Sequence, residues 1–247
     1  GAGAKSHMSA LATAAILAQN GIEPILQFTT RDRNRIAIQG DLLGGWALDI
    51  PNILCLYGDE VKGGDQPDTK EVRDLDTIGI LKTAHDIKTK KMYPSGRKIN
   101  DAPEFFIGGA DTPFKVSNDF DGLNLIKKIE AGVEFFQTQY AFDENILKNY
   151  MLKLNELHIT DKAYFIIGLG VIKSAKSARW MNKNLFGINI PEEIINRIEQ
   201  SNDESLEGRK ICIELVEKYK SIEGVSGIHL MGYKQEKEIA SVISHFK

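Results

Sequence analysis

A strand–helix–strand pattern between Glu23 and Asp59 constrains the fold of this chain more than any other feature. The run from Pro24 to Phe28 is apolar, which predicts a buried strand. After a charged break, apolar residues recur at helical spacing from Ile36 to Ala47, and a second apolar strand runs from Ile53 to Leu56. In parallel α/β proteins the carboxyl ends of strands carry the chemistry. Here those ends carry Thr29, Thr30 and Asp32 after the first strand, and Tyr57, Gly58 and Asp59 after the second.

The rest of the chain repeats the alternation. Further strands are predicted at Phe105–Gly109, Glu134–Gln139, Tyr164–Gly168 and Gly227–Met231. Further helices are predicted at Ser9–Gln19, Asp76–Lys88, Asp121 onward, Glu144–Leu157, Ser174–Asn182, Pro191–Gln200, Glu204–Lys220 and Gln235–Phe246. This alternation predicts a parallel sheet, either an open doubly wound sheet or a (β/α)8 TIM-type barrel. No GxGxxG follows a strand, which weighs against a dinucleotide-binding sheet, so we favour the barrel although only about six of its eight strands are visible.

The composition narrows the class of protein. A chain of 247 residues with 42% hydrophobic content can bury one sizeable core, so we expect a single domain over residues 1–247. Lys and Arg (31) nearly balance Asp and Glu (34), which argues against a nucleic-acid or membrane-surface binder because either would need a basic excess. No apolar run approaches the roughly 18–20 residues that span a bilayer, and no signal peptide is recognisable. Cys55 and Cys212 lie in separate apolar segments, as expected for reduced core thiols in a cytoplasmic protein rather than a disulfide.

Polar residues at several strand ends admit two interpretations. Gln137, Thr138 and Gln139 close the fourth predicted strand, where an apolar ending would suit a plain core. The functional interpretation is a ring of hydrogen-bonding groups around a polar, planar ligand. The structural interpretation is that Asp32 and Asp59 are caps and the threonines are strand termini. Three strand ends together favour the ligand site.

Two local patterns refine the ligand hypothesis. Gly58 would let the backbone approach a flat ring closely, and the carboxylate of Asp59 beside it could accept hydrogen bonds or oppose developing charge. The helix that starts at Asp121 carries Asn124, Lys127 and Lys128 at spacings that place them on one face. That face is either a solvated, salt-bridged surface, which its pattern alone favours, or a clamp on ribose hydroxyls and phosphates.

Other chemistries find little support in the residue pattern. The five histidines show no metal-ligand spacing, so no metal site is expected. His229 lies within the last strand and could face a barrel mouth or be a satisfied core imidazole. No Ser/His/Asp or Cys/His nucleophile set can be assembled. Trp46 and Trp180 fit helix faces and are expected in the core.

Three ordered motifs resemble those of the methylenetetrahydrofolate reductase family, especially its bacterial FAD-dependent type. They are QFTTRDRNRIAIQGDLLGGWALDIPNILCLYGD, which contains a T-x-R-D-R-N-R element, FFQTQYAFD at residues 135–143 and VIKSAKSARWMN at residues 171–182. The resemblance covers about the whole chain. The segment GAKSHMSALA also resembles the family's segment after its second barrel strand, which favours a native N-terminus over a vector remnant.

The resemblance implies an FAD-containing (β/α)8 barrel that reduces 5,10-methylenetetrahydrofolate to 5-methyltetrahydrofolate in one-carbon metabolism, with hydride passing through the flavin. It implies a catalytic role for Asp59, which would also reach the pterin, and a folate contact for Gln139. Relatives often carry histidine at the Gln27 site and arginine or threonine at the Tyr57 site. The residues implied to bind the flavin are Gln27, Thr29, Tyr57, Gly58, Asp59, Asp74, Thr112, Asp121, Asn124, Lys127 and Lys128.

One family element has no counterpart in this sequence. The family's general acid is a glutamate on the first barrel strand in an F-E-x-x-P-like context, and no such motif occurs here. With the count of six strands, this leads us to expect that the first two strand–helix units are absent, through truncation or because a partner chain supplies them.

Several alternatives stay open at this point. The electron donor is NADH, NADPH or a partner redox protein, and the assembly a homo-oligomer or a complex with a second subunit. The alternative function is a flavin- or folate-binding subunit of a larger redox complex with little activity on its own. A phosphate-binding barrel of other chemistry, suggested only by Gly168-Leu169-Gly170, is the weaker third hypothesis.

Overall fold

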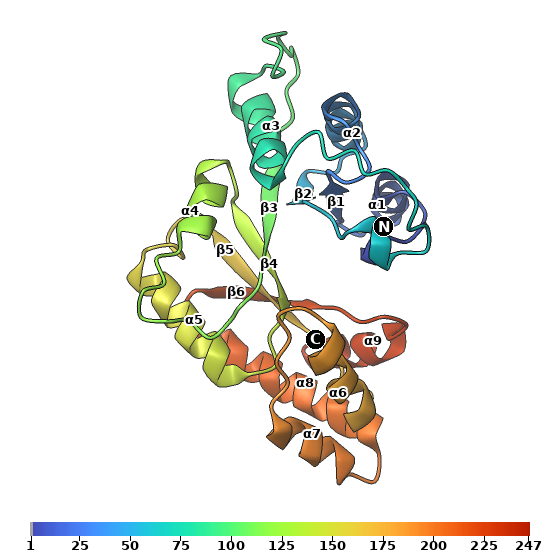
Figure 1. The fold of residues 1–247 in the computed structure, drawn as a ribbon, viewed down its shortest axis with the longest axis vertical. Coiled ribbons are helices and arrows are strands. Elements are labelled where there is room, and N and C mark those ends of the chain that lie inside the picture. Colours follow the sequence, from blue (N-terminus) through green and yellow to red (C-terminus); the bar gives the residue numbers. More distant parts are fainter. Residues whose placement is uncertain (1) are drawn as a thin grey trace. The chain divides into compact units, whose positions relative to one another are not determined.

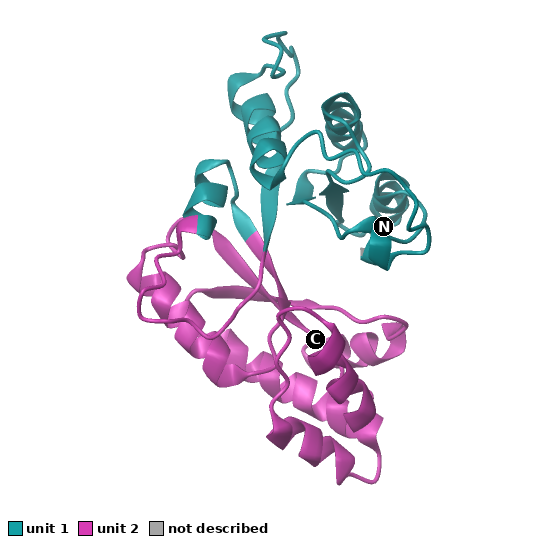
Figure 2. Ribbon diagram, in the orientation of Figure 1, with its two compact units in different colours: residues 1–110, 124–135 teal, residues 111–123, 136–247 magenta. Residues whose placement is uncertain are grey.

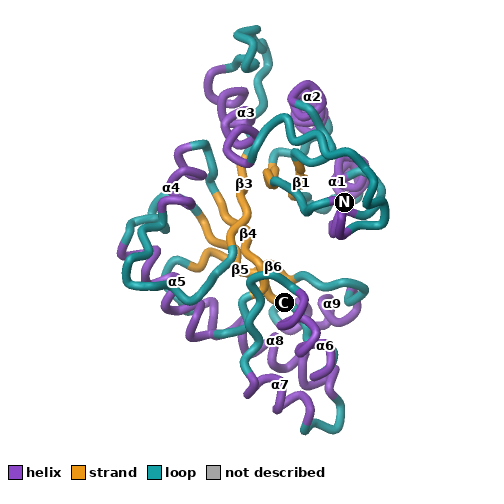
Figure 3. The backbone as a smooth tube through the Cα atoms, viewed as in Figure 1, coloured by secondary structure: helices purple, strands orange, loops and turns teal. Residues whose placement is uncertain are grey.

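The computed structural model describes residues 2–247, and across them strands alternate with helices along the chain (Figures 1 and 3). The residues form two compact units (Figure 2). Unit 1 consists of residues 1–110 and 124–135, and unit 2 of residues 111–123 and 136–247. None of the helices in the described part of the chain combines the length and the apolar character needed to cross a lipid bilayer.

Unit 1 is built on parallel strands that lie in chain order. Strand β1 (Ile25–Thr29) pairs with β2 (Asn52–Leu56), with Ile25 opposite Asn52. Strand β2 pairs in turn with β3 (Phe106–Asp111). The helices of this unit are α1 (Ala10–Gln19), α2 (Arg35–Ala47), α3 (Thr77–Lys90) and α4 (Leu123–Glu130), and two short 3-10 turns lie at Ala2–Ala4 and Val61–Gly63.

Local sequence explains where the helices of unit 1 begin. The side chain of Asn34 accepts a hydrogen bond from the N–H of Ala37 (3.0 Å), and that of Asp76 accepts one from Gly79 (2.6 Å), so each satisfies a free donor of the first turn. The apolar faces of these helices meet the strands in a core of almost fully buried side chains. It includes Leu26, Phe28, Ile38, Leu42, Ile53, Leu54, Cys55, Ile80, Leu81 and Ile87.

Unit 2 repeats the same architecture with β4 (Phe135–Tyr140), β5 (Tyr164–Leu169) and β6 (Val225–Leu230). The N–H of Gly168 donates to the hydroxyl of Thr138 (2.8 Å), which ties β5 to β4. Strands β5 and β6 are parallel, with a bulge between Phe165 and Ile166. The helices are α5 (Glu144–Glu156), α6 (Ala175–Asn184), α7 (Glu192–Glu199), α8 (Glu204–Lys220) and α9 (Glu236–His245).

The structure confirms the predicted α/β fold class. In both units consecutive strands are neighbours, as in a (β/α) barrel, whereas a doubly wound sheet reverses its order at a switch point. The element boundaries agree with prediction to within about two residues. Helix α4 starts at Leu123 rather than Asp121, because the carboxylate of Asp121 caps it by accepting from the N–H of Leu123 (3.0 Å).

Of the two tryptophans predicted to lie in the core, Trp46 is partly buried and Trp180 is exposed. Trp46 is half-buried and packs edge-on against Phe105, with ring centroids 6.1 Å apart. Trp180 is 56% exposed on α6, so its predicted place in the core is wrong. The loop between α3 and β3 also holds an antiparallel bridge between Met92 and Lys98 that no residue pattern predicted.

Candidate functional site

A cavity of about 870 Å³ in unit 1 lies at the carboxyl ends of β1 and β2. Predicted site residues on both strand ends line it, namely Gln27, Thr29, Tyr57, Gly58 and Asp59. It is also lined by residues 4–10, which lead into α1, by Arg31, Asp32 and Arg33 after β1, and by part of the polar loop after β2, including Asp65 and Thr69. Parallel pairing of β1 with β2 brings the two polar strand ends together, as the pattern of the sequence predicts.

A buried arginine lies beneath the end of β2. Arg31 is only 3% exposed, and its Nε and one terminal nitrogen each donate to the carboxylate of Asp32 at 2.7 Å. Its other terminal nitrogen donates to the backbone carbonyl of Asp59 (3.2 Å). This hydrogen-bonded pairing raises the pKa of Arg31 and lowers the pKa of Asp32, so both groups are charged at neutral pH.

A second arginine covers the same turn. The guanidinium carbon of Arg73 lies 3.8 Å from the ring centroid of Tyr57, which is a cation–π contact. Its terminal nitrogens donate to the carbonyls of Tyr57 (3.1 Å) and Gly58 (3.3 Å). Its Nε donates to Glu71, and this bond lowers the pKa of the Glu71 carboxyl.

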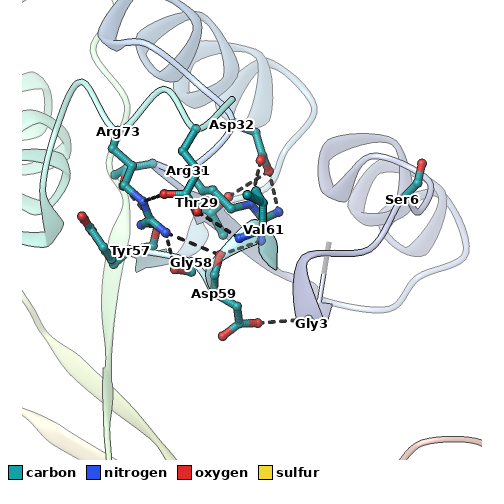
Figure 4. Close-up of polar contacts among 12 residues, drawn as sticks. Gly3, Ser6, Thr29, Arg31, Asp32, Tyr57, Gly58, Asp59, Val61 and Arg73 are labelled. Atoms are coloured by element: carbon teal, nitrogen blue, oxygen red, sulfur yellow. Dashed lines mark hydrogen bonds and ion pairs between the residues drawn. The ribbon is translucent and has the colours of Figure 1, made fainter. Parts of the chain in front are cut away.

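Residues 71–73, here called the strap, hold Arg73 in place. The N–H of Val72 donates to the carbonyl of Arg31 (2.7 Å), and that of Arg73 donates to Thr30 (3.1 Å). The second carboxylate oxygen of Glu71 accepts from the N–H of Val61 (2.9 Å). The strap therefore pairs with the backbone just after β1 and brings Arg73 over the turn that follows β2 (Figure 4).

The turn itself requires glycine. Gly58 has a φ of 89°, a conformation that other residues rarely adopt. A Cβ at this position would also lie 3.1 Å from the Cβ of Thr29 and 3.2 Å from that of Arg31. The side chain of Asp59 points away from the two arginines and accepts from the N–H of Gly3 at 3.0 Å (Figure 4). Segment 4–10 is thus tied to the cavity wall near its start.

The remaining predicted residues of unit 1 do not line this cavity. The carboxylate of Asp74 accepts three hydrogen bonds from Arg35, at 2.7 to 2.9 Å, and this contact lowers the pKa of Asp74. Lys128 donates to the carbonyl of Ala110 (2.7 Å), while Asn124 and Lys127 are exposed on α4. Of the four predicted residues at this helix, Asp121 and Lys128 have structural partners, whereas Asn124 and Lys127 are open to solvent.

Three predicted residues belong to unit 2. The side-chain oxygen of Gln139 accepts from the N–H of Tyr140 (3.0 Å), and Asp121 caps α4. Thr112 lies close to Gly187, where a Cβ would come within 2.5 Å of its methyl group. His229 is hydrogen-bonded to Gln137 (3.0 Å between nitrogens), and burial lowers its pKa, so the imidazole is neutral at pH 7. Convergence of Gln139 with Thr29 and Asp59 stays a prediction.

The residue pattern did not single out Arg31, Arg73 or Glu71. Arg31 belongs to the T-x-R-D-R-N-R element, and its place directly after a buried strand was the available signal. Arg73 ends a long polar loop and carried no signal, because its role depends on the folded path of the strap. In the described part of the chain, no group of three or more His, Cys, Asp or Glu side chains is arranged to hold a metal ion.

Comparison with known proteins finds similarity both in sequence and in fold. A curated Caenorhabditis elegans protein described as "Probable methylenetetrahydrofolate reductase (NADPH)" is 25% identical over 243 residues. The match covers 97% of this chain but only 34% of that protein, so the chain spans about a third of that relative's length. A Clostridium thermocellum structure, described as an uncharacterised protein that binds two copies of 5-methyl-5,6,7,8-tetrahydrofolic acid, shares the fold. Its TM-score is 0.59 at 17% identity, with 93% of this chain and 75% of that chain covered.

A sequence model of one family gives the most extensive match. It is the model of methylenetetrahydrofolate reductase, and it matches residues 1–247. The three motifs that suggested this family all lie within the match. The chain belongs to the methylenetetrahydrofolate reductase family.

Proposed function

We propose that this chain binds FAD and a reduced folate and carries the reduction of 5,10-methylenetetrahydrofolate to 5-methyltetrahydrofolate. The cavity at the ends of β1 and β2 is the observation that carries the proposal, because it gathers Thr29, Tyr57, Gly58 and Asp59. Family membership and the name of the C. elegans relative support the reaction. The folate bound by the C. thermocellum protein supports the substrate class.

The residues around the cavity fit an isoalloxazine ring. The exposed ring of Tyr57, backed by Arg73, offers a flat surface on which a planar system can stack. The missing Cβ of Gly58 lets the ring approach the backbone, and Gln27 and Thr29 add hydrogen-bonding groups along β1. Bound flavin would supply two-electron hydride chemistry, which no protein side chain offers.

The protein's own residues have distinct tasks in this proposal. Asp59 places a carboxylate at the turn, and Gln139, whose side-chain oxygen accepts from the N–H of Tyr140, can donate its amide N–H groups to a pterin edge. The exposed Asn124 and Lys127 on α4 could bind ribose hydroxyls and phosphates of FAD. The name of the C. elegans relative, which specifies NADPH, favours NADPH as electron donor.

The first experiment measures flavin uptake and folate-dependent reoxidation. The purified chain should quench FAD fluorescence and show a protein-bound flavin absorbance band. Under anaerobic conditions, photoreduced flavin on the protein should be reoxidised by 5,10-methylenetetrahydrofolate and not by 5-methyltetrahydrofolate. Absence of FAD binding would refute the proposal.

The same samples distinguish the second candidate function. A flavin- or folate-binding subunit of a larger redox complex would bind FAD but leave the reduced flavin unreacted with the folate. Tyr57, at a site where relatives often carry arginine or threonine, motivates that alternative. Reoxidation of the flavin by folate in the chain alone would exclude it.

A further inference from the structure

Two arginines hold three successive carbonyl groups at the end of β2. Arg73 donates to the carbonyl oxygens of Tyr57 (3.1 Å) and Gly58 (3.3 Å), and more weakly to that of Asp59 (3.5 Å). Arg31 donates to Asp59 from the buried side (3.2 Å). The hydroxyl of Thr30 adds a bond to the carbonyl of Tyr57 (3.2 Å). All three carbonyls of the turn are therefore fixed by side chains.

The orientation of the carbonyls determines that of the next N–H groups. No peptide bond among residues 2–247 is cis, and in a trans peptide the C=O and the following N–H point in opposite directions. The N–H groups of Gly58, Asp59 and Glu60 are thus directed away from the carbonyl-binding guanidinium groups. None of the three donates a hydrogen bond to another described residue. Gly58 and Asp59 both line the cavity.

We propose that Arg31 and Arg73 are positioning residues that present these three N–H groups to the electron-rich edge of a planar, redox-active ring. Successive backbone N–H groups that point the same way form an anion-binding concavity. Their effect is greatest where charge develops during the reaction, because fixed donors need no reorganisation. This inference rests on the proposed function, in which the ring is the flavin and the charge is that of its reduced form.

The negative charge of Asp59 makes such donors useful. Asp59 lies on the same turn, and its carboxylate would disfavour an anionic ring beside it. The three N–H groups offset part of that repulsion, while the charges of Arg31 and Arg73 are balanced by the carboxylates of Asp32 and Glu71. The cost of forming the reduced ring is thereby lowered.

Arginine is needed at position 73 for its shape as well as its charge. The planar guanidinium donates to two carbonyls and stacks on the ring of Tyr57 at the same time. A lysine ammonium can make a point contact but cannot reproduce both interactions. The side chain of Tyr57 is still 47% exposed, which leaves the other face of its ring available to a planar ligand.

The chain contains a matched control for Arg73. Arg97 also stacks on a tyrosine, with its guanidinium carbon 4.3 Å from the ring centroid of Tyr93. Neither Arg97 nor Tyr93 lines the cavity. Arg97→Gln therefore removes a charge and a stacking contact without touching the turn, while Arg73→Lys keeps the charge that pairs with Glu71.

The test compares Arg73→Gln, Arg73→Lys and Arg97→Gln in the FAD-loaded chain. The readouts are the affinities for oxidised and reduced FAD and the midpoint potential from dye equilibration. We expect Arg73→Gln to bind oxidised FAD within about threefold of wild type but reduced FAD at least about tenfold more weakly. Its midpoint potential should shift to more negative values, Arg73→Lys should be intermediate, and Arg97→Gln should match wild type.

A second measurement, made on the wild-type protein, tests the inference even if Arg73→Gln fails to fold. In wild type, FAD should slow amide hydrogen exchange at residues 58–60, and absence of such protection overturns the inference. If wild type binds FAD but Arg73→Gln and Arg97→Gln have the same midpoint potential, the positioning role of Arg73 is overturned while the proposed function stands. If wild type takes up no FAD, both are overturned.

Discussion

Gly58 combines a left-handed backbone with close neighbours, and both conditions bear on the cavity. Its φ is 89°, and a Cβ would lie 3.1 to 3.3 Å from atoms of Thr29 and Arg31. Gly96 has a similar φ of 84°, but a Cβ there would meet nothing within 4 Å. Comparing alanine substitutions at Gly58 and Gly96 therefore separates the cost of backbone strain from the cost of steric contact with neighbouring atoms.

We predict that Gly58→Ala lowers the free energy of unfolding by about 2–3 kcal/mol and weakens FAD binding. Gly96→Ala should cost about 1 kcal/mol, because it carries only the backbone penalty, and should leave FAD affinity unchanged. Urea denaturation and FAD titration measure the two effects. Equal losses of stability in the two variants would show that crowding at Gly58 is unimportant.

At the residue level, the sequence predicted which side chains lie together where their placement follows directly from chain position. Thr29, Tyr57 and Asp59 come directly after apolar strands, and parallel pairing of those strands brings them together. Arg73 could not be found this way. It lies 16 residues from the carbonyl of Tyr57 to which it donates, and the strap between Glu71 and Arg73 must first pair with the backbone after β1.

At the scale of elements, α4 shows why a helical pattern alone leaves two functions open. Asn124, Lys127 and Lys128 share a face by their spacing, yet the structure gives them different surroundings. Lys128 is bound to the carbonyl of Ala110, whereas Lys127 is exposed. Spacing predicts which residues share a face but not which of them already have partners.

The two lysines should therefore respond differently to loss of charge. Lys128→Gln should lower the free energy of unfolding by about 1 kcal/mol, since it removes a charged hydrogen bond to a backbone carbonyl. Lys127→Gln should leave stability unchanged and weaken FAD binding about three- to tenfold if the helix face binds its phosphates, with a salt-dependent effect. FAD titration at two ionic strengths tests this. An unchanged affinity in Lys127→Gln would assign that lysine to the solvated surface.

Element boundaries were predictable because caps are local. Asn34, Asp76 and Asp143 each accept hydrogen bonds from the first turn of the helix that follows. Such signals lie within three residues of the bond they form. The antiparallel bridge of Met92 with Lys98 lacks a comparable local signal, and the exposure of Trp180 depends on which helix face finds a partner.

At the scale of the whole molecule, the boundary between the two units cuts through secondary structure. It passes within β3, α4 and β4 rather than through a flexible linker. Domain boundaries normally fall in linkers with few contacts. The sequence predicted one domain because the strand–helix alternation is unbroken, while the division into compact units depends on contact density, which periodicity does not encode. We propose that the chain unfolds as one cooperative domain.

Each unit contains one buried thiol that can report on this proposal. Cys55 belongs to unit 1 and Cys212 to unit 2, and both are free. Burial raises the pKa of each to about 12, from an ordinary value of 9.0. Because each thiol has a higher pKa in the folded state than in the unfolded state, the two thiols do not lower the free energy of unfolding below about pH 9. As the pH rises from 9 towards 12, the free energy of unfolding falls, because the unfolded state loses its thiol protons first. At pH 8 the thiols are protonated and shielded, so alkylation requires opening of the surrounding structure.

Pulse alkylation with iodoacetamide across a urea series at pH 8, read out for each cysteine by mass spectrometry, should therefore give coincident midpoints. A cooperative domain exposes both thiols in the same transition, since rupture inside β3 and β4 disrupts both cores together. Two separated midpoints would instead mean that the units open independently. The cavity, which lies wholly in unit 1, could then persist while unit 2 is unfolded, and FAD binding should protect Cys55 but not Cys212. In a cooperative domain the same ligand protects both thiols equally, so adding FAD to the labelling series tests the coupling a second time.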